Sequence, residues 1–275
     1  MRPLLMLLAV SSGVAFAAPN TVCTNPASPT NITSGKTAAN IVELYTSEGC
    51  DSCPPADKLF STLPASDTST IPLAFHVDYW DYIGWKDRFA KPGYAQRQRE
   101  EVARQGSRTV YTPQFLLNGK DWRSSGLNGS PAGYFAASLS PRAPKATLVL
   151  ASSVETPSQS PPKASEGNNQ LQVKLQVNIP DAGARKDAAV FIAITENNLL
   201  SRVTAGENRG ATLKHDHVVR ELVGPIPVRL DGNLEIVRSI SFARDWKQAD
   251  LSIVAFVQSN RDGEILQAIT SPLCR

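Results

Sequence analysis

The chain has 275 residues, a formal net charge of +3 and 19% charged residues. Its length leaves room for two domains, each large enough to bury its own hydrophobic core. Lysine and arginine are scattered along the sequence rather than gathered in a basic block, which excludes the usual charge pattern of a nucleic-acid-binding protein. We therefore expect no nucleic-acid partner.

Residues 1–18 have the three parts of a secretory signal peptide. Arg2 supplies the positive charge, residues 4–10 are apolar, and residues 15–17 (Ala-Phe-Ala) form a small-residue cleavage site. The alternative, a membrane anchor, needs about 20 consecutive apolar residues, and the polar residues 11–13 interrupt the run. The sequence predicts an exported protein, periplasmic or secreted, with no membrane contact once the signal peptide is cleaved.

Residues 19–40 are rich in Thr, Asn, Ser, Pro and Ala and have no apolar period, so we expect an extended leader. The stretch that follows contains Cys50 and Cys53. An apolar run and a turn bring these cysteines to Pro54, a residue type favoured in the first turn of a helix. A spacing of two residues suits zinc binding, a structural disulfide or redox exchange, and an oxidising compartment favours a disulfide.

The two remaining cysteines, Cys23 and Cys274, lie near the two ends of the mature chain. An even number of cysteines in an exported protein favours pairing, whereas the alternative leaves both thiols free in frayed tails. We expect a structural disulfide between them. It would close a very long loop and contribute about 4 to 5 kcal/mol in the chain-entropy model.

Between residues 41 and 142 the predicted elements follow a recognisable order. They are a strand at 41–45, the cysteine helix, a strand at 71–79, a helix at 94–105, Thr112-Pro113 before a strand, an Asn-Gly turn at 118–119, another strand and a helix at 130–139. This order is typical of a thioredoxin-like α/β domain. In that fold the proline is cis and faces the dithiol; an ordinary trans proline that opens an edge strand is the alternative.

Four motifs lie within residues 43–119: ELYTSEGCDSCPPAD, FHVDYWDYIGWKDRFA, YAQRQ and VYTPQFLLNG. Together they resemble the exported family catalogued as domain of unknown function twelve-twenty-three. The resemblance implies a thioredoxin-like domain followed by a smaller β-rich extension. It implies no particular reaction, because the family has no established one.

Residues 143–275 predict a β-rich domain, with a linker at 155–169 and a half-buried strand at 171–179, where apolar residues alternate. Further strands are expected at residues 146–153, 188–196, 215–223, 234–242, 251–258 and 264–270. Many short strands at such intervals are typical of a sandwich. The predicted fold class is therefore α/β: a thioredoxin-like domain at residues 41–142, followed by a smaller β-sandwich-like domain at residues 143–275.

The dithiol chemistry assigns roles to five residues. Cys50, at the helix start, is the attacking sulfur and Cys53 is the resolving one. Thr112 and Pro113 shape the substrate groove. Glu43, inside the first strand, is a candidate for relaying a proton to Cys53, and a solvent-facing Glu43 is the alternative.

Histidines supply the remaining candidates. His76 and Asp78 share one face of a predicted strand. Three alternatives are open: they line a groove beside the dithiol, they bind a metal together with the sulfurs, or they pair with one another. We favour the last. His215 and His217 also share a strand face, but two imidazoles do not complete a tetrahedral metal site, so we expect both on an exposed surface. We predict no metal site and no cofactor.

Three functions fit these features. The leading hypothesis is exchange with protein thiols or disulfides through Cys50 and Cys53. The second is a non-enzymatic exported binding protein in which the same pair is a structural disulfide. The third is a thiolate metal chaperone that recruits His76. A thioredoxin-like fold would not decide between them, because that fold hosts many roles.

Overall fold

The computed structural model describes residues 31–63, 68–122, 140–155 and 169–273. Strands make up 46% and helices 15% of these residues. The predicted signal peptide, Cys23, Cys274 and the helix expected at 130–139 lie outside them. In the part of the chain that is described, no helix is both long and apolar enough to cross a bilayer.

Every strand expected between residues 41 and 270 has a counterpart, and β1, β9 and β10 were not predicted, since the strand expected at 215–223 corresponds to β11. The strands are β1 (Ile32–Thr33), β2 (Asn40–Thr46), β3 (Thr70–His76), β4 (Gln114–Leu117), β5 (Lys120–Asp121), β6 (Thr147–Glu155), β7 (Asn169–Asn178), β8 (Ala188–Glu196), β9 (Leu199–Arg202), β10 (Thr212–His215), β11 (Val218–Pro227), β12 (Asn233–Phe242), β13 (Leu251–Ser259) and β14 (Ile265–Pro272). The helices are α1 (Pro54–Phe60), α2 (Pro92–Arg104) and α4 (Ala182–Lys186), with short 3₁₀ helices η1 (Asp81–Ile83) and η2 (Gln248–Asp250).

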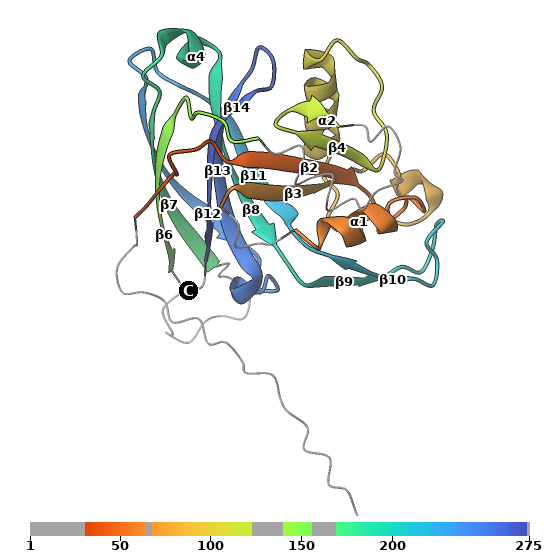
Figure 1. The fold of residues 1–275 in the computed structure, drawn as a ribbon. Coiled ribbons are helices and arrows are strands. Elements are labelled where there is room, and N and C mark those ends of the chain that lie inside the picture. The colour runs from red at the N-terminus through yellow and green to blue at the C-terminus, as the bar shows by residue number, and fades with distance from the viewer. Residues whose placement is uncertain (1–30, 64–67, 123–139, 156–168, 274–275) are drawn as a thin grey trace, which may run out of the picture.

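One large mixed sheet dominates the molecule. It contains eight strands in the order β14-β13-β8-β11-β3-β2-β4-β5. Strand β3 is parallel to both β2 and β11, and the other neighbours are antiparallel. A four-stranded antiparallel sheet, β1-β6-β7-β12, forms a second layer beside β8, β13 and β14, on the side of the molecule away from α1 (Figure 1).

This topology shows that the predicted fold class is wrong. A thioredoxin-like α/β domain followed by a smaller β-sandwich-like domain was expected, but the described residues are mostly β-sheet. Strand β11, from the second half of the chain, pairs with β3 from the first half, so that a single sheet runs through both. The period of the apolar residues locates strands, but it does not say which strands pair across long stretches of sequence.

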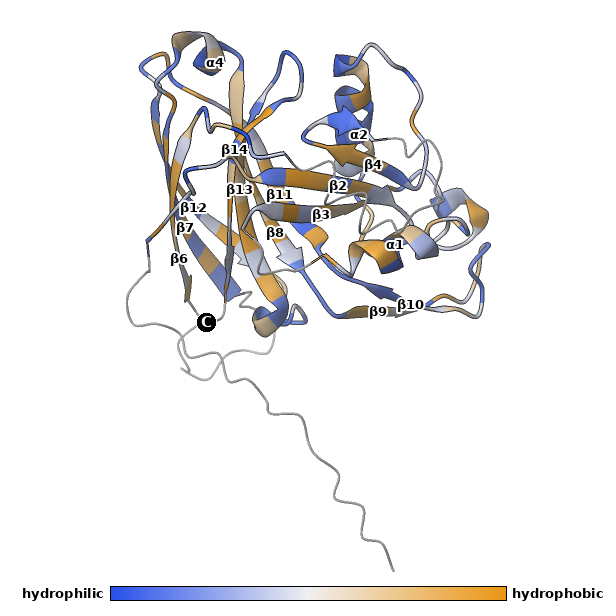
Figure 2. Ribbon diagram, viewed as in Figure 1, coloured by the Kyte–Doolittle hydropathy of each residue, from blue (hydrophilic) through white to orange (hydrophobic). Residues whose placement is uncertain are grey.

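The main core lies between the four-stranded sheet and the β8-β13-β14 part of the large sheet. Along β8, Val190 and Ile192 face this core, whereas Phe191 and Ala193 face the opposite side, where α2 packs. Burial on both faces explains the nearly continuous apolar sequence of this strand. Figure 2 shows the same contrast: β8 and β13 are mainly apolar, whereas hydrophilic residues recur along β7 and β12.

Helix α2 joins the two halves of the large sheet through Arg97. Its guanidinium donates to both carboxylate oxygens of Glu43 on β2, at 3.0 and 2.7 Å, and to Oε1 of Gln258 on β13, at 3.0 Å. Arg97 is only 5% exposed. A buried guanidinium requires such partners, so this network fixes α2 against strands from both halves.

Helix α1 covers the other face of β2 and β3, where Phe60 packs against Val42, Leu44 and Ala74. Strands β9 and β10 form an antiparallel hairpin that runs along α1 (Figure 1). We call residues 203–211, which connect these two strands, the cap loop. An element of the second half of the chain therefore reaches the helix that follows Cys53.

The turn between β4 and β5 confirms the predicted Asn-Gly hairpin. Asn118 and Gly119 have φ values of 50° and 77°, as a two-residue turn of the I′ type requires. This turn meets the one between β13 and β14, because a Cβ atom on Gly119 would lie 2.1 Å from the carbonyl oxygen of Gly263. The two turns pack backbone against backbone and form a further link between the halves.

Candidate functional site

Cys50 and Cys53 form a disulfide, with their Cα atoms 5.4 Å apart. Strand β2 ends at Thr46, and after the turn Cys53 caps α1, whose first residue is Pro54. The predicted strand, turn and helix, and the pairing of these two cysteines, are confirmed. Both cysteines are 0% exposed, so the disulfide is not open to solvent.

The cap loop is bonded to the turn that carries Cys50. Nδ2 of Asn208 donates to the carbonyl oxygens of Glu48 and Cys50, both at 2.9 Å. Oε2 of Glu207 accepts a hydrogen bond from the backbone N–H of Asp51 at 3.1 Å. These bonds hold the cap loop against the backbone on both sides of Cys50.

Residues 80–85 pack on the same turn. A Cβ atom on Gly49 would lie 3.1 Å from Cβ of Trp80 and 3.3 Å from Cδ1 of Ile83. Cδ1 of Ile83 also lies 3.1 Å from the position of a Cβ atom on Gly206 in the cap loop. The cysteine turn, residues 80–85 and the cap loop therefore form one closely packed unit.

Trp80 connects this unit to Thr112. Its indole N–H donates to Oγ1 of Thr112 at 2.8 Å, and the peptide bond between Thr112 and Pro113 is cis, as predicted. Trp80 thus contacts both the cysteine turn and the Thr-Pro segment. The role of Thr112 and Pro113 in shaping a substrate groove stays a prediction.

Five ionisable side chains gather next to the cysteine turn, and none is more than 7% exposed. We call them the acid–base cluster: Glu48, Asp57, His76, Asp87 and His215. Strands β2 and β3 are parallel, with Thr46 opposite His76, so the residues at their carboxyl ends meet at one edge of the sheet. Helix α1 brings Asp57 to this edge, and β10 brings His215.

Two imidazoles organise the cluster. Nδ1–H of His76 donates to Oδ2 of Asp87 at 2.6 Å. The ring of His215 lies between two carboxylates, with Nε2 at 3.4 Å from Oε1 of Glu48 and Nδ1 at 3.7 Å from Oδ2 of Asp57. His215 therefore bridges a carboxylate that precedes Cys50 and one that follows Cys53.

One hydrogen bond orients each of these two carboxylates. The indole N–H of Trp85 donates to Oε2 of Glu48 at 2.7 Å, and Oγ1 of Thr46 donates to Oδ1 of Asp57 at 2.8 Å. Oδ2 of Asp87 accepts the backbone N–H of Glu48 at 2.9 Å, which links the His76 pair to the cysteine turn. The carboxylates are positioned by the fold, and each keeps one oxygen turned toward His215.

Within the residues that the structure describes, five polar atoms around His215 have no hydrogen-bond partner. They are Oε1 of Glu48, Oδ2 of Asp57, Nε2 of His76 and both ring nitrogens of His215. A buried polar atom without a partner costs about 1 to 3 kcal/mol, so folded proteins contain few of them. Their concentration in one place makes this cluster the candidate functional site.

Burial and mutual contact shift the protonation of the cluster. Burial raises the pKa of Asp57, although His215 and His76 partly oppose the shift. Burial alone would lower the pKa of His76, but the charge and hydrogen bond of Asp87 outweigh it, so the pKa is raised. The pKa of Asp87 is lowered, because His76 outweighs the effect of burial. The pair of His76 and Asp87 thus favours its charged form, whereas burial disfavours the charged form of Asp57.

Glu43, the predicted proton relay, lies on the face of β2 that α2 covers. Arg97 bonds both of its oxygens, and the hydroxyl of Tyr45 donates to Oε2 at 2.6 Å. Glu43 is therefore buried rather than solvent-facing. Alternation along β2 directs Thr46 to the opposite face, where it contacts Asp57. Glu43 therefore lies on the face of the sheet away from Cys53, whereas Asp57 lies on the same side as the cysteines.

The favoured pairing of His76 with Asp78 is wrong. His76 bonds to Asp87, which lies in the loop before α2, whereas Asp78 follows the end of β3 and is partly exposed. The sequence contains no local signal for this contact. An aspartate two residues away on the same strand was the only partner that strand periodicity could suggest.

The prediction that His215 and His217 are exposed is also wrong, since they are 2% and 5% exposed. Nε2–H of His217 donates to the carbonyl oxygen of Leu63 at 3.0 Å, and burial lowers the pKa of this histidine. His217 is thus satisfied outside the cluster. The pairing of β9 with β10 places His215 against α1. The spacing of His215 and His217 in the sequence does not indicate this pairing.

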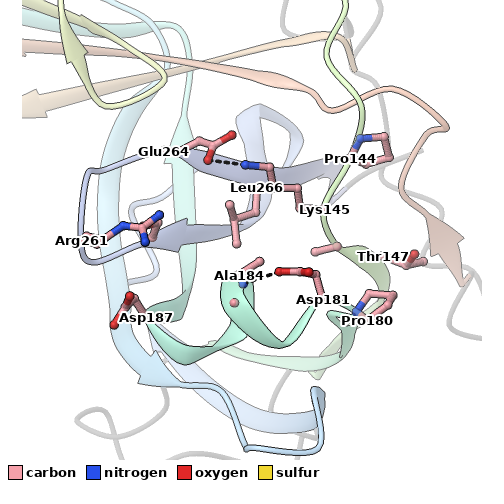
Figure 3. A pocket seen from close by; sticks show the side chains of 13 residues that line it. Pro144, Lys145, Thr147, Pro180, Asp181, Ala184, Asp187, Arg261, Glu264 and Leu266 are labelled. Carbon is pink, nitrogen blue, oxygen red and sulfur yellow. Dashed lines mark hydrogen bonds and ion pairs between the residues drawn. The ribbon is translucent and has the colours of Figure 1, made fainter.

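Within the described residues, no group of three or more His, Cys, Asp or Glu side chains is arranged to hold a metal ion. A cavity of about 630 Å³ lies elsewhere, between β6, α4 and β14, where Lys145 and Glu264 form an ion pair at 2.6 Å (Figure 3). In Figure 1, α4 and α1 lie at opposite ends of the molecule. This cavity is therefore separate from the disulfide.

The family model for proteins of unknown function DUF1223 matches residues 41–258. The chain belongs to this family. The match extends the DUF1223 resemblance from residues 43–119 to both halves, in agreement with the continuous sheet. No curated protein matches this DUF1223 chain.

Two solved structures are similar to this DUF1223 chain. Protein AGR_C_4864 from Agrobacterium tumefaciens is 22% identical, with a TM-score of 0.53, over 85% of this chain and 94% of that one. HBP35 of Porphyromonas gingivalis is 15% identical, with a TM-score of 0.60, over 87% of this chain and 76% of that one. At these identities the likeness concerns the fold alone.

Proposed function

We propose that the chain exchanges disulfides with protein thiols through Cys50 and Cys53. The observation that carries this proposal is the position of the disulfide beside the acid–base cluster, where Glu48 precedes Cys50 and Asp57 follows Cys53. A structural disulfide needs no ionisable groups beside it. Exchange makes use of them, because each sulfur that attacks or leaves must lose or gain a proton, and a neighbouring group supplies or accepts it.

Reduction of the pair proceeds in two steps. A thiolate of the partner dithiol attacks Sγ of Cys50, the disulfide breaks, and Cys53 leaves as a thiolate that takes up a proton. The second thiolate of the partner then attacks the mixed disulfide, and Cys50 leaves as a thiolate. The partner dithiol is oxidised to a disulfide, and Cys50 and Cys53 are reduced; the reverse sequence starts with attack by Cys50.

One observation favours a second candidate, a non-enzymatic binding protein with a structural disulfide. Both cysteines are 0% exposed, so exchange requires a movement of the segments packed on the cysteine turn, which include the cap loop and residues 80–85. A cap loop that never opens would leave the disulfide inert. The two candidates therefore differ in whether the folded protein reacts with thiols.

The reduction potential of the Cys50–Cys53 pair tests the proposal. The folded protein is equilibrated in thiol redox buffers, and reduced cysteines are counted by the mass added on alkylation. We expect a value between about −270 and −120 mV, the range of exchange proteins. A value well below about −300 mV would assign the pair to a structural disulfide.

A trapping experiment assigns the two sulfurs. Cys53→Ser leaves Cys50 without its resolving partner, so mixed disulfides with partner proteins should accumulate and be released by dithiothreitol. Cys50→Ser is the matched control and should capture far fewer. Equal capture by both variants would contradict the assignment of Cys50 as the attacking sulfur.

Export is part of the same proposal, because an oxidising compartment supplies the partners of such a pair. Residues 1–18 carry the features of a signal peptide. Expression in an exporting host should yield a mature protein that lacks this segment, and the mass of the purified chain checks it. A full-length cytoplasmic product would contradict the proposed location.

A further inference from the structure

We infer that His215 is a positioning residue for thiol exchange: it controls the proton that Asp57 delivers to Cys53 and takes back from it. The inference rests on the proposed function and extends it to a residue in the second half of the chain. It assigns a task to the polar atoms around His215, which have no hydrogen-bond partner.

Asp57 lies one helical turn after Cys53. Cys53 has helical backbone angles, with φ of −79° and ψ of −37°, and the N–H of Asp57 donates to its carbonyl oxygen at 3.0 Å. Residues four apart in a helix lie on one face, with Cβ atoms about 5 to 6 Å apart. Thr46 holds Oδ1 of Asp57, while Oδ2 has no hydrogen-bond partner.

His215 is placed to control Asp57. Its Nδ1 lies 3.7 Å from Oδ2 of Asp57, and its Nε2 lies 3.4 Å from Oε1 of Glu48. His76 contacts the same ring edge to face, with the centroids 4.9 Å apart. Asp87 bonds to His76, with its Oδ2 at 2.6 Å from Nδ1 of the ring. Groups from α1, β3 and two loops therefore surround His215 on β10.

The charge balance of the acid–base cluster requires it to retain protons. The cluster has three carboxyl groups and two imidazoles, so one negative charge remains even when both imidazoles are protonated. In the described part of the chain, none of its ion pairs or hydrogen bonds reaches a lysine or arginine. An uncompensated buried charge is costly, and a carboxyl group removes it by holding a proton. The cluster thus stores at least one proton beside the disulfide.

Reduction of the disulfide uses this stored proton. Two electrons come from the partner dithiol, whose two protons pass to solvent. Cys53 leaves as a thiolate and receives a proton from Asp57, and His215, whose Nδ1 lies 3.7 Å from Oδ2 of Asp57, is positioned beside the carboxylate that results. Cys50 takes its proton from solvent in the second step. Reoxidation returns the proton from Cys53 to Asp57, so the cluster is restored.

The rate of reduction by dithiothreitol tests the inference. It is measured from about pH 5 to pH 9, and at each pH it is divided by the concentration of dithiothreitol thiolate. The wild-type rate should fall as pH rises, because the cluster loses its transferable proton. His215→Gln and Asp57→Asn should each be slower at neutral pH by about 100-fold or more and should flatten the profile. The double variant should be no slower than the slower single variant, because the two residues act as one unit.

His217→Gln is the matched control. His217 is a buried histidine two residues after His215, but it bonds to the carbonyl oxygen of Leu63. This variant should keep the wild-type pH profile. A flattened profile in His217→Gln would overturn the inference, because it would show that any change in the segment that carries these two histidines flattens the pH profile.

A second measurement does not depend on variants. The imidazole of His215 is titrated by NMR in the oxidised and in the reduced protein. Proton exchange with Cys53 requires the two midpoints to differ, so identical midpoints would overturn the inference. An unchanged profile in His215→Gln would also overturn it and leave the exchange function standing. Reduction that occurs only after unfolding would overturn both.

Discussion

The rings of His76 and His215 meet edge to face, with their centroids 4.9 Å apart, although His76 ends β3 and His215 ends β10. These strands come from the two halves of the chain, and each half contributes one imidazole to the acid–base cluster. The candidate site is therefore a product of the whole fold. A fragment that ends before β9 would contain the disulfide but neither His215 nor the cap loop.

The pair of His76 and Asp87 predicts a window of pH-dependent stability. The pKa of His76 is raised, so its contribution is complete below about 6.5, the unfolded value, and is lost as pH rises through the folded value. The pKa of Asp87 is lowered, so its contribution is complete above about 3.9 and is lost as pH falls through the folded value. The pair thus contributes most between about pH 4 and 6.5.

Asp87→Asn should lower the free energy of unfolding by about 3 to 5 kcal/mol within this window, because it leaves a buried imidazolium without its partner. Above the folded pKa of His76 the difference from wild type should shrink. Urea unfolding at several pH values measures it, and Asp51→Asn, at an exposed carboxylate, is the control. A loss that is the same at every pH would contradict the ion pair.

The cap loop predicts a variant in which the disulfide reacts faster. Asn208→Ala removes two hydrogen bonds to the cysteine turn. At about 1 kcal/mol for each bond, the open state should become about 10- to 30-fold more populated, and the rate of reduction by dithiothreitol should rise by the same factor. The measurement is the fraction of alkylated cysteine against time.

Arg209→Ala is the control for this variant, because Arg209 lies in the same loop and its side chain is exposed. Its rate should equal that of the wild type. If Asn208→Ala reacts no faster than Arg209→Ala, opening of the cap loop does not limit access to the sulfurs.

Local structure could be predicted from the sequence because it depends on neighbouring residues. The apolar runs of β2, β3 and β8, the prolines that open α1, and the Asn-Gly turn all act over a few positions. The cysteine pair was found for the same reason. The cis isomer at Thr112-Pro113 was expected from its place in the element order, and it is present.

The acid–base cluster could not be predicted because it depends on pairing between distant segments. Asp57 had a usable signal, since it follows Cys53 by one helical turn, but a carboxylate near a cysteine is common. His215 had none. Its burial follows from the β9-β10 hairpin, and β9 was not predicted. The fold-class prediction failed for the same reason, since nothing local indicates that β11 pairs with β3.

The network around Arg97 predicts that the two halves unfold together. Arg97→Met leaves Glu43 buried without its ion-pair partner and should cost about 3 to 5 kcal/mol. Arg99→Met, on the exposed side of the same helix, should change stability by less than about 0.5 kcal/mol. Both variants should show one cooperative urea transition by fluorescence and by circular dichroism. Two separate transitions in the wild type would show that the halves are independent units.

The contact between Gly119 and Gly263 predicts a large cost for a single methyl group. In Gly119→Ala the new Cβ would lie 2.1 Å from a backbone oxygen, and no side-chain movement can relieve that overlap. Gly106→Ala isolates the backbone strain, because Gly106 has a similar φ of 73° and no atom within 4 Å of its Cβ position. The control should cost about 1 to 2 kcal/mol. Gly119→Ala should cost about 2 kcal/mol more, because the β4-β5 and β13-β14 turns must separate. Equal losses of unfolding free energy in the two variants would mean that these turns are not in contact in solution.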